Sequence, residues 1–311
     1  MSVPLVVCLG QFTIDDVVRW DGLVRMGAVG GDAVYSWLGA HLWADQVGIV
    51  APIGDDFPTE ALGALHSAGG SLDGVVTRHV PTIRNWVLYE EDGRRSWVMR
   101  SDPANSYLLS PRFDDIPEPY RGARAFHIAA MDLRAQAELL DALRRAGVLL
   151  AFDPQEDYIP GNEPRFLQML RHIDLFLPSG IEVRQLVGHV DYARAAREIA
   201  AEGPRVVAVK LGAEGAFVFE RETGHHLHVP AYPARVVDET GAGDAFCGGF
   251  VAAVVQGHSV FEAAARAIVS ASFVVQTAGW LSTLQFSRAD AEERLRDYRS
   301  SVFPGRSAPV P

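Results

Sequence analysis

A glycine-rich turn followed by an aspartate, in residues 238–246, is the pattern that most directly indicates chemistry. The segment reads Asp-Glu-Thr-Gly-Ala-Gly-Asp-Ala-Phe. It joins a stretch rich in strand-forming residues, 229–237, to an apolar helix that we expect to begin near Asp244. Glycines let backbone N–H groups approach one point, and a helix start adds N–H donors and the positive end of the helix dipole. The turn Gly241-Ala242-Gly243 is therefore predicted to bind an anion.

Asp244 lies where a carboxylate could take a proton from an attacking hydroxyl group. An anion site beside a general base is what phosphoryl transfer to an alcohol requires. The competing interpretation is structural, because aspartate is a favoured N-cap residue and glycine turns are common. For Gly-Ala-Gly-Asp alone the two interpretations are about equally good, so the wider sequence has to decide between them.

Composition narrows the classes of function. The chain has 311 residues, of which 48% are hydrophobic, and a formal net charge of -11. An acidic chain is poorly suited to nucleic acids or membrane surfaces, so we expect neither as a partner. The two cysteines, Cys8 and Cys247, are far apart and do not indicate a disulfide or zinc framework. The first ten residues predict a strand rather than a signal peptide, and we expect a cytoplasmic enzyme.

Short apolar segments alternate with helical patterns along most of the chain. Strands are predicted at residues 5–9, 47–53, 125–129, 148–152, 173–177 and 206–211. Helices with an aspartate or serine at their start are predicted at 132–145, 191–201 and 259–275. Such alternation predicts a mostly parallel sheet with helices on both faces, which is a three-layer α/β/α fold.

Two segments interrupt this alternation. Residues 12–29 and 80–100 each read as strands on either side of a turn, which indicates two hairpins. We expect them to form a small antiparallel sheet that acts as a lid on the main domain. Because its strand edges would be exposed, a second copy of the chain could pair there, and a homodimer through the lid is a candidate assembly. Residues 1–300 are predicted to be one domain, and 301–311 a flexible tail.

The full string from Asp238 to Phe250, Asp-x-Thr-Gly-Ala-Gly-Asp-Ala-Phe-x-Gly-Gly-Phe, resembles the C-terminal signature of the ribokinase-like, or PfkB, carbohydrate kinases. The resemblance extends over about residues 5–284. It implies a ribokinase-like fold and ATP-dependent phosphorylation of a hydroxyl group on a small molecule. It also implies Asp244 as the general base, the Gly-Ala-Gly turn as an anion hole, and ATP and Mg²⁺ as cofactors.

The N-terminal half resembles the acceptor-binding part of this family. Gly30-Gly31-Asp32-Ala33 is similar to the first family signature, and Gly10-Gln-Phe-Thr-Ile-Asp15 to its opening motif. The resemblance places Asp15, Gly30 and Gly31 against acceptor hydroxyls, and a carboxylate suits a polyol because it accepts several hydrogen bonds. Tyr35 stands where the family commonly carries an acceptor-binding asparagine. This difference disfavours ribose or fructose and favours a modified sugar, a cyclitol or a nucleoside.

Lys210 is the only lysine of the chain, and it lies in a segment similar to the nucleotide-binding loop of the family. The resemblance implies that Lys210, Gly212, Gly215 and Thr240 bind ATP. An ammonium group at this position would neutralise phosphate charge. Two aromatic residues, Tyr35 and Trp86, are candidates to stack on an acceptor ring.

The segment Pro178-Ser-Gly-Ile-Glu182 stands where the family has Pro-Asn-x-x-Glu. The resemblance implies that Glu182 orients a water molecule bound to Mg²⁺. The same spacing is that of a capping box, which explains these residues structurally. Asp238 and the segment near Gly279 resemble the monovalent-cation loop of the family, so K⁺ is a candidate activator. Asp153 follows a predicted strand at the same edge of the sheet.

Three functions stay open at this point: a sugar kinase, a nucleoside kinase of the same family, and a catalytically silent kinase-like binding protein. The sequence contains no Gly-x-x-x-x-Gly-Lys-[Ser/Thr], so a P-loop kinase is excluded. The absence of Gly-x-Gly-x-x-Gly after the first strand disfavours a dinucleotide dehydrogenase. The intact turn before Asp244 favours an enzyme, whereas Tyr35 and Ser179 depart from the family pattern and keep the silent protein under consideration.

Overall fold

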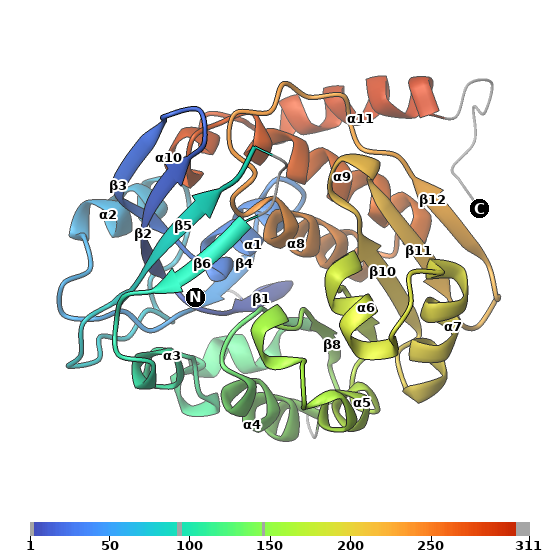
Figure 1. Ribbon diagram of the computed structural model, residues 1–311, viewed down its shortest axis with the longest axis horizontal. Helices are drawn as coiled ribbons and strands as arrows, with labels where there is room; N and C mark the ends of the chain where they lie inside the picture. The colour runs from blue at the N-terminus through green and yellow to red at the C-terminus, as the bar shows by residue number, and fades with distance from the viewer. Residues whose placement is uncertain (1–2, 92–94, 145–146, 303–311) are drawn as a thin grey trace.

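Eight strands form a large sheet in which most neighbours run parallel (Figure 1). The computed structural model describes residues 3–91, 95–144 and 147–302. The strands of this sheet are β1 (Val6–Leu9), β4 (Val47–Val50), β7 (Ala125–Ile128), β8 (Leu149–Phe152), β9 (Leu175–Phe176), β10 (Val206–Lys210), β11 (Ala216–Glu220) and β12 (His226–Val229). Their order is β12-β11-β10-β9-β8-β7-β1-β4, with antiparallel pairing at β10–β11 and β11–β12. The strands expected from the sequence are the parallel part of this sheet.

Helices cover both faces of the large sheet, as the alternation of apolar segments predicts (Figure 1). On one face lie α1 (Asp32–His41), α2 (Thr59–Ser67), α8 (Ala242–Val255), α9 (Val260–Val275) and α11 (Arg288–Val302). On the other face lie α4 (Leu133–Leu143), α5 (Glu163–Leu170), α6 (Gly180–Val187) and α7 (Tyr192–Glu202). Alternate residues of β1 enter different apolar cores, Val6 on the α8 side and Val7 on the α4 side. The three-layer α/β/α architecture is confirmed.

Local capping fixes several of these helices where the sequence indicates. The Asp132 carboxylate accepts hydrogen bonds from the first amides of α4, at 2.9 and 3.2 Å. The Ser259 hydroxyl accepts from the Glu262 amide at 3.3 Å at the start of α9. At the start of α6, Ser179 and Glu182 form the expected capping box. Each cap satisfies amides that have no partner within the helix.

A smaller sheet lies beside the large one, at the left of Figure 1. It contains β2 (Thr13–Arg19), β3 (Val24–Gly30), β5 (Ile83–Tyr89) and β6 (Arg95–Met99), in the order β3-β2-β5-β6. The two hairpins β2–β3 and β5–β6 are antiparallel, as expected, but β2 and β5 pair in parallel. The expectation of a purely antiparallel sheet is therefore wrong. The reason is that β2 and β5 both start near the carboxyl ends of large-sheet strands, next to β1 and β4 respectively, and leave in the same direction.

Other sequence-based expectations need correction at element boundaries. The stretch 229–237 was expected to be strand-like, but β12 ends at Val229 and residues 230–237 form no strand. Helix α8 begins at Ala242, two residues before the expected start, so Asp244 lies inside its first turn. Helix α11 extends to Val302, while the rest of the expected tail and the hairpin residues 92–94 lie outside the described residues. Among the described helices, none is long and apolar enough to span a membrane.

Candidate active site

The carboxyl ends of three adjacent parallel strands bring together a lysine and two carboxylates. Lys210 ends β10, Asp153 follows β8, and Glu182 lies in the first turn of the helix after β9. Lys210 Nζ donates a hydrogen bond to Asp153 Oδ2 at 2.5 Å, and a backbone bridge joins Ser179 to Lys210. Crevices at this edge of a parallel sheet are where α/β proteins bind ligands. The fold therefore brings the predicted Lys210 and Glu182 to one place.

Burial and neighbouring charges shift the pKa values of these side chains. Lys210 and Asp153 expose only 14% and 4% of their side chains. Burial opposes the charge of Lys210, but Asp153, Cys247 and Glu182 together outweigh that effect and raise the pKa of the ammonium group. Burial and then repulsion from Asp153 raise the pKa of Glu182 to about 8. The site thus keeps a fixed positive charge at Lys210 and disfavours a second negative charge beside Asp153.

The predicted anion-binding turn lies next to this lysine. Gly241 is the N-cap of α8, and a β-carbon built on Gly243 would lie 3.9 Å from Lys210 Nζ. Asp244 is half-buried in the first turn of the helix. The amide of Ala242 already donates to the Glu239 carbonyl at 3.2 Å. The positive end of the 14-residue helix and the ammonium group therefore face the same small region.

Tyr35, a residue of α1, packs against this turn. It is buried, with 3% exposure, and its ring lies against Gly241. A β-carbon on Gly241 would come within 2.2 Å of that ring, and the φ of Gly241 is +80°. Both the close contact and the left-handed backbone require glycine here. From the sequence we expected Tyr35 to contact the acceptor. The structure shows its ring packed against the turn, and its contact with an acceptor stays a prediction.

The predicted acceptor residues meet on one face of the smaller sheet. We call the face that carries Thr13, Asp15 and Asn85 the inner face. Asp15 Oδ1 accepts from the side-chain amide of Asn85 at 2.9 Å, and Oδ2 accepts from Thr13 at 2.8 Å. Oδ2 of Asp15 would lie 2.7 Å from a β-carbon on Gly30, so the carboxylate fills the space that a side chain at that position would need. Gly31 follows as the N-cap of α1. Asp15, Gly30 and Gly31 are thus neighbours in the fold.

Asn85 and Asp32 were missed as site residues, although each had a signal. Asn85 is a polar residue on the face of β5 that also carries Ile83 and Val87, where alternation predicts apolar side chains. Asp32 directly follows the Gly-Gly pair, and its carboxylate accepts from the Gln11 amide at 2.8 Å. Burial and then repulsion from Asp244 raise the pKa of Asp32 well above its ordinary value. Asp32 therefore adds a further acidic group to the surroundings of Asp244.

Trp86 lies on the other face of the smaller sheet. It neighbours Asn85 in β5, and successive residues of a strand point to opposite faces. Its side chain is 44% exposed, and the Arg100 guanidinium lies 5.2 Å from its ring centre. Trp86 thus lies on the face opposite Asp15 and Asn85, and its stacking on an acceptor ring stays a prediction.

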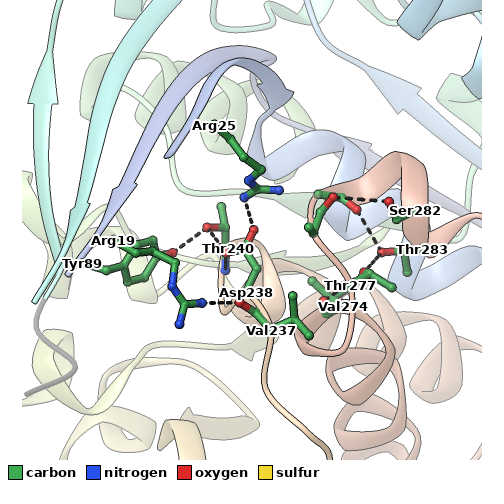
Figure 2. A network of polar contacts seen from close by, with 12 residues as sticks. Arg19, Arg25, Tyr89, Val237, Asp238, Thr240, Val274, Thr277, Ser282 and Thr283 are labelled. Carbon is green, nitrogen blue, oxygen red and sulfur yellow. Dashed lines mark hydrogen bonds and ion pairs between the residues drawn. The ribbon is translucent and has the colours of Figure 1, made fainter. Parts of the chain in front are cut away.

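Thr240 and Asp238 lie in the loop that leads into α8 (Figure 2). Asp238 Oδ1 accepts from the amide and the hydroxyl of Thr240, at 3.0 and 2.7 Å. Side chains of the smaller sheet reach the same loop: Arg25 pairs with Asp238, and the Tyr89 hydroxyl lies 2.5 Å from Thr240 Oγ1. The other predicted nucleotide residues, Gly212 and Gly215, form the turn between β10 and β11 directly after Lys210.

Comparison with known proteins shows the family to which the chain belongs. The pfkB family carbohydrate kinase profile matches residues 26–285. A cytidine kinase of Thermococcus kodakarensis is 31% identical over 258 residues, which cover 82% of this chain and 90% of that protein.

Two solved structures share the fold. A nucleoside kinase of Burkholderia thailandensis in complex with inosine superposes with a TM-score of 0.79 at 17% identity, covering 97% of this chain and 98% of that one. An Arabidopsis thaliana ribokinase complexed with ribose and ATP gives a TM-score of 0.72 at 24% identity, covering 95% and 99%. With the family profile spanning most of its length, the chain belongs to the PfkB family of carbohydrate kinases.

Proposed function

We propose that the protein is an ATP-dependent kinase that phosphorylates a hydroxyl group of a sugar or a nucleoside. The observation that carries this proposal is the position of the buried Lys210–Asp153 pair beside the start of α8, with Asp244 in the first turn of that helix. A fixed cation, a helix start and a carboxylate are the groups that phosphoryl transfer uses.

In the proposed reaction the acceptor oxygen attacks the γ-phosphorus of ATP and the bond to ADP breaks. Asp244 takes the proton of the acceptor hydroxyl as that oxygen attacks. The start of α8 at Gly241-Ala242-Gly243 and the ammonium of Lys210 stabilise negative charge on the transferring group. These groups are already held in place by packing, so little reorganisation is needed when charge develops.

The nucleotide is assigned to the edge formed by β10 and its following turn. Lys210, Gly212 and Gly215 lie within six residues of the chain there, and Thr240 lies in the loop before α8. Mg²⁺ would neutralise charge on the phosphates when bound. Asp153 Oδ1 is buried without a hydrogen-bond partner, and Glu182 is buried nearby, so oxygen donors suited to a hard cation or its water ligands are present.

The acceptor is assigned to the inner face of the smaller sheet, which would act as a lid. Asp15 would accept hydrogen bonds from acceptor hydroxyls, beside Gly30 and Gly31, and Asn85 offers an amide next to it. The 31% identity to a cytidine kinase favours a nucleoside over a free sugar as the acceptor. Tyr35, placed against Gly241, would influence acceptor choice through the shape of the turn or through its own edge.

An acceptor panel tests the proposal. Purified protein would be incubated with ATP, Mg²⁺ and cytidine, inosine, ribose or fructose, and ADP formation measured. We expect acceptor-dependent ADP formation, faster with a nucleoside than with ribose or fructose, and slower by orders of magnitude with Asp244→Asn as the matched control. Faster reaction with a free sugar would assign a sugar kinase. ATP binding without ADP formation for any acceptor would instead identify a silent binding protein.

A homodimer through the smaller sheet is a separate proposal. Trp86 and Val98 pair in register on its outer face, and both are more than two-fifths exposed. Burying such apolar surface against a second copy would stabilise a dimer. Sedimentation of wild type and Val98→Glu tests this: we expect a dimer for the wild type and a monomer for the variant, and a monomeric wild type would contradict it.

A further inference from the structure

The loop before α8, residues 237–240, is held by three side chains of the smaller sheet (Figure 2). Arg19 donates to the Val237 carbonyl, Arg25 donates to Asp238 Oδ2, and the Tyr89 hydroxyl lies 2.5 Å from Thr240 Oγ1. These side chains come from β2, β3 and β5, more than 150 residues away in sequence. The loop that leads into the anion-binding turn is therefore shaped in part by the smaller sheet.

A β-bulge directs Arg25 toward this loop. In the β2–β3 pairing, Asp15 lies opposite Ala28 but Val17 lies opposite Arg25, so β3 has one residue more than β2 over this stretch. Without the extra residue, alternation would place Arg25 on the face opposite Ala28. The bulge occurs where Gly27 has a φ of +67° and its amide donates to Asp16 at 2.7 Å. It brings Arg25 to the inner face with Arg19 and Tyr89.

The carboxylate that the sequence suggested for K⁺, that of Asp238, is engaged by groups of the protein, and so is a neighbouring backbone carbonyl. Asp238 is 4% exposed; Oδ2 accepts from Arg25, and Oδ1 accepts from the amide and hydroxyl of Thr240. The Val275 carbonyl at the end of α9 accepts from the amides of Val237 and Asp238, at 2.7 and 3.2 Å. A β-carbon built on Gly279 would lie 3.4 Å from Nη1 of Arg25. The guanidinium thus lies between Asp238 and the segment near Gly279.

We infer that Arg25 is the resident cation of this loop and takes the place that the resemblance assigns to K⁺. A guanidinium is permanently charged and donates several directed hydrogen bonds, so it can neutralise Asp238 without a bound ion. Arg25 is a positioning residue: it acts on Asp238, which orients Thr240 and hence the turn at Gly241. Its effect on phosphoryl transfer rests on the proposed function, whereas its effect on cation binding does not.

One consequence follows from the origin of Arg25 in the smaller sheet. A K⁺ ion would stay with the large domain when the smaller sheet moves, but Arg25 moves with β3. The loop before α8 is then neutralised when the smaller sheet lies against it. Contact of the smaller sheet with this loop and neutralisation of Asp238 are then one event, to which Arg19 and Tyr89 contribute further contacts.

Thermal unfolding of the full-length protein tests the inference without nucleotide or acceptor. Wild type and Arg25→Ala would be melted in KCl and in tetramethylammonium chloride at equal ionic strength. We expect the wild type to melt at the same temperature in both salts. Arg25→Ala should melt higher in KCl by about 2 °C or more, because K⁺ that binds the folded protein stabilises it by mass action.

ATP titration provides a second measurement. Arg25→Ala should bind ATP about tenfold more weakly than wild type in tetramethylammonium chloride and recover in KCl. Arg25→Lys keeps a cation and should bind ATP independently of K⁺. The matched control is Arg84→Ala, which removes an arginine of β5 in the same sheet, paired with Asp56 at 2.9 Å and remote from the loop. It should respond to neither salt.

A K⁺-dependent melting temperature or ATP affinity of the wild type would overturn the inference. An Arg25→Ala protein that is indifferent to K⁺ would overturn it as well. Should Arg25→Ala fail to fold, the wild-type salt series and the milder Arg25→Gln decide in the same way. Absence of ATP binding in every salt would contradict the proposed kinase function instead, while the melting temperatures would still test the role of Arg25.

Discussion

The edge of the large sheet and the smaller sheet both carry ion pairs, but the pairs differ in burial. At the edge, Lys210 and Asp153 are 14% and 4% exposed and lie against the start of α8. In the smaller sheet, Arg84 and its partner Asp56 are each 38% exposed. The Arg25–Asp238 pair is intermediate in burial. Its guanidinium comes from the smaller sheet and is 23% exposed, whereas its carboxylate is 4% exposed.

This difference suggests a division of tasks. Buried charges act in a medium of low polarity, where they are strong and fixed, which suits the stabilisation of phosphate charge. Exposed pairs such as Arg84–Asp56 are screened and contribute little to holding the smaller sheet in place. We therefore expect the chemistry to belong to the large sheet and the choice and enclosure of the acceptor to the smaller one.

The largest expected contrast is in stability. Lys210→Met leaves Asp153 buried without its partner and should lower the free energy of unfolding by about 3–5 kcal/mol. Arg84→Ala, the matched change in the smaller sheet, should lower it by about 0–1 kcal/mol. Urea unfolding of both variants measures the contrast. Adding Asp153→Asn to Lys210→Met should restore part of the loss; equal losses for the two single variants would contradict the proposed difference between the sheets.

A smaller effect is expected on acceptor binding. Asp15→Asn removes the charge but keeps an oxygen for Asn85, so the fold should persist. Losing charge-assisted hydrogen bonds to the acceptor costs about 1.5–3 kcal/mol, so the acceptor KM should rise about tenfold to a hundredfold while the KM for ATP stays constant. Asp16→Asn, the neighbouring carboxylate bonded to Gly27, is the control. A rise in the KM for ATP instead would show that Asp15 does not belong to the acceptor site.

The smallest expected effect is on the pH dependence of stability, and it arises in the interior of the large sheet. His127 in β7 is fully buried, neither ring nitrogen has a hydrogen-bond partner, and burial lowers its pKa to about 3. Between that value and the ordinary pKa near 6.5, the unfolded chain binds a proton that the folded protein does not. The stability associated with the neutral ring is therefore present above the ordinary pKa and falls as pH decreases toward 3.

His127→Leu should remove this dependence. From pH 7 to pH 5 the wild type should lose about 2 kcal/mol more unfolding free energy than the variant. Urea titrations of both proteins at the two pH values measure the difference, and other titrating groups cancel in the comparison. Parallel losses would mean that His127 is protonated or solvated in the folded state.

Local patterns were enough to predict the parallel strands of the large sheet, because each is a short apolar run and several helices have recognisable caps. The antiparallel strands β11 and β12 were not among the predicted strands. The same patterns placed the Gly241 turn and Asp244 correctly next to a helix. The start of α8 was misjudged by two residues because glycine and alanine in its first turn look like loop residues in the sequence.

Contacts between distant segments could not be predicted. The Arg25–Asp238 pair joins residues 213 apart, and it depends on a bulge whose position no sequence pattern indicates. The family resemblance gives the position of Tyr35 along the chain but not the direction of its ring, so its packing against Gly241 could not be predicted. The parallel pairing of β2 with β5 likewise depends on where each strand leaves the large sheet.

The central claim, that the large sheet carries the chemistry with Asp244 as the base, has one direct test. It is the turnover number of Asp244→Asn, measured with the best acceptor of the panel and beside the ATP dissociation constant of the same protein. The change keeps the shape of the side chain and removes its basicity. We predict a loss in kcat on the order of 10²–10⁴-fold with unchanged ATP binding and unchanged melting temperature. Turnover at the wild-type rate would contradict the claim.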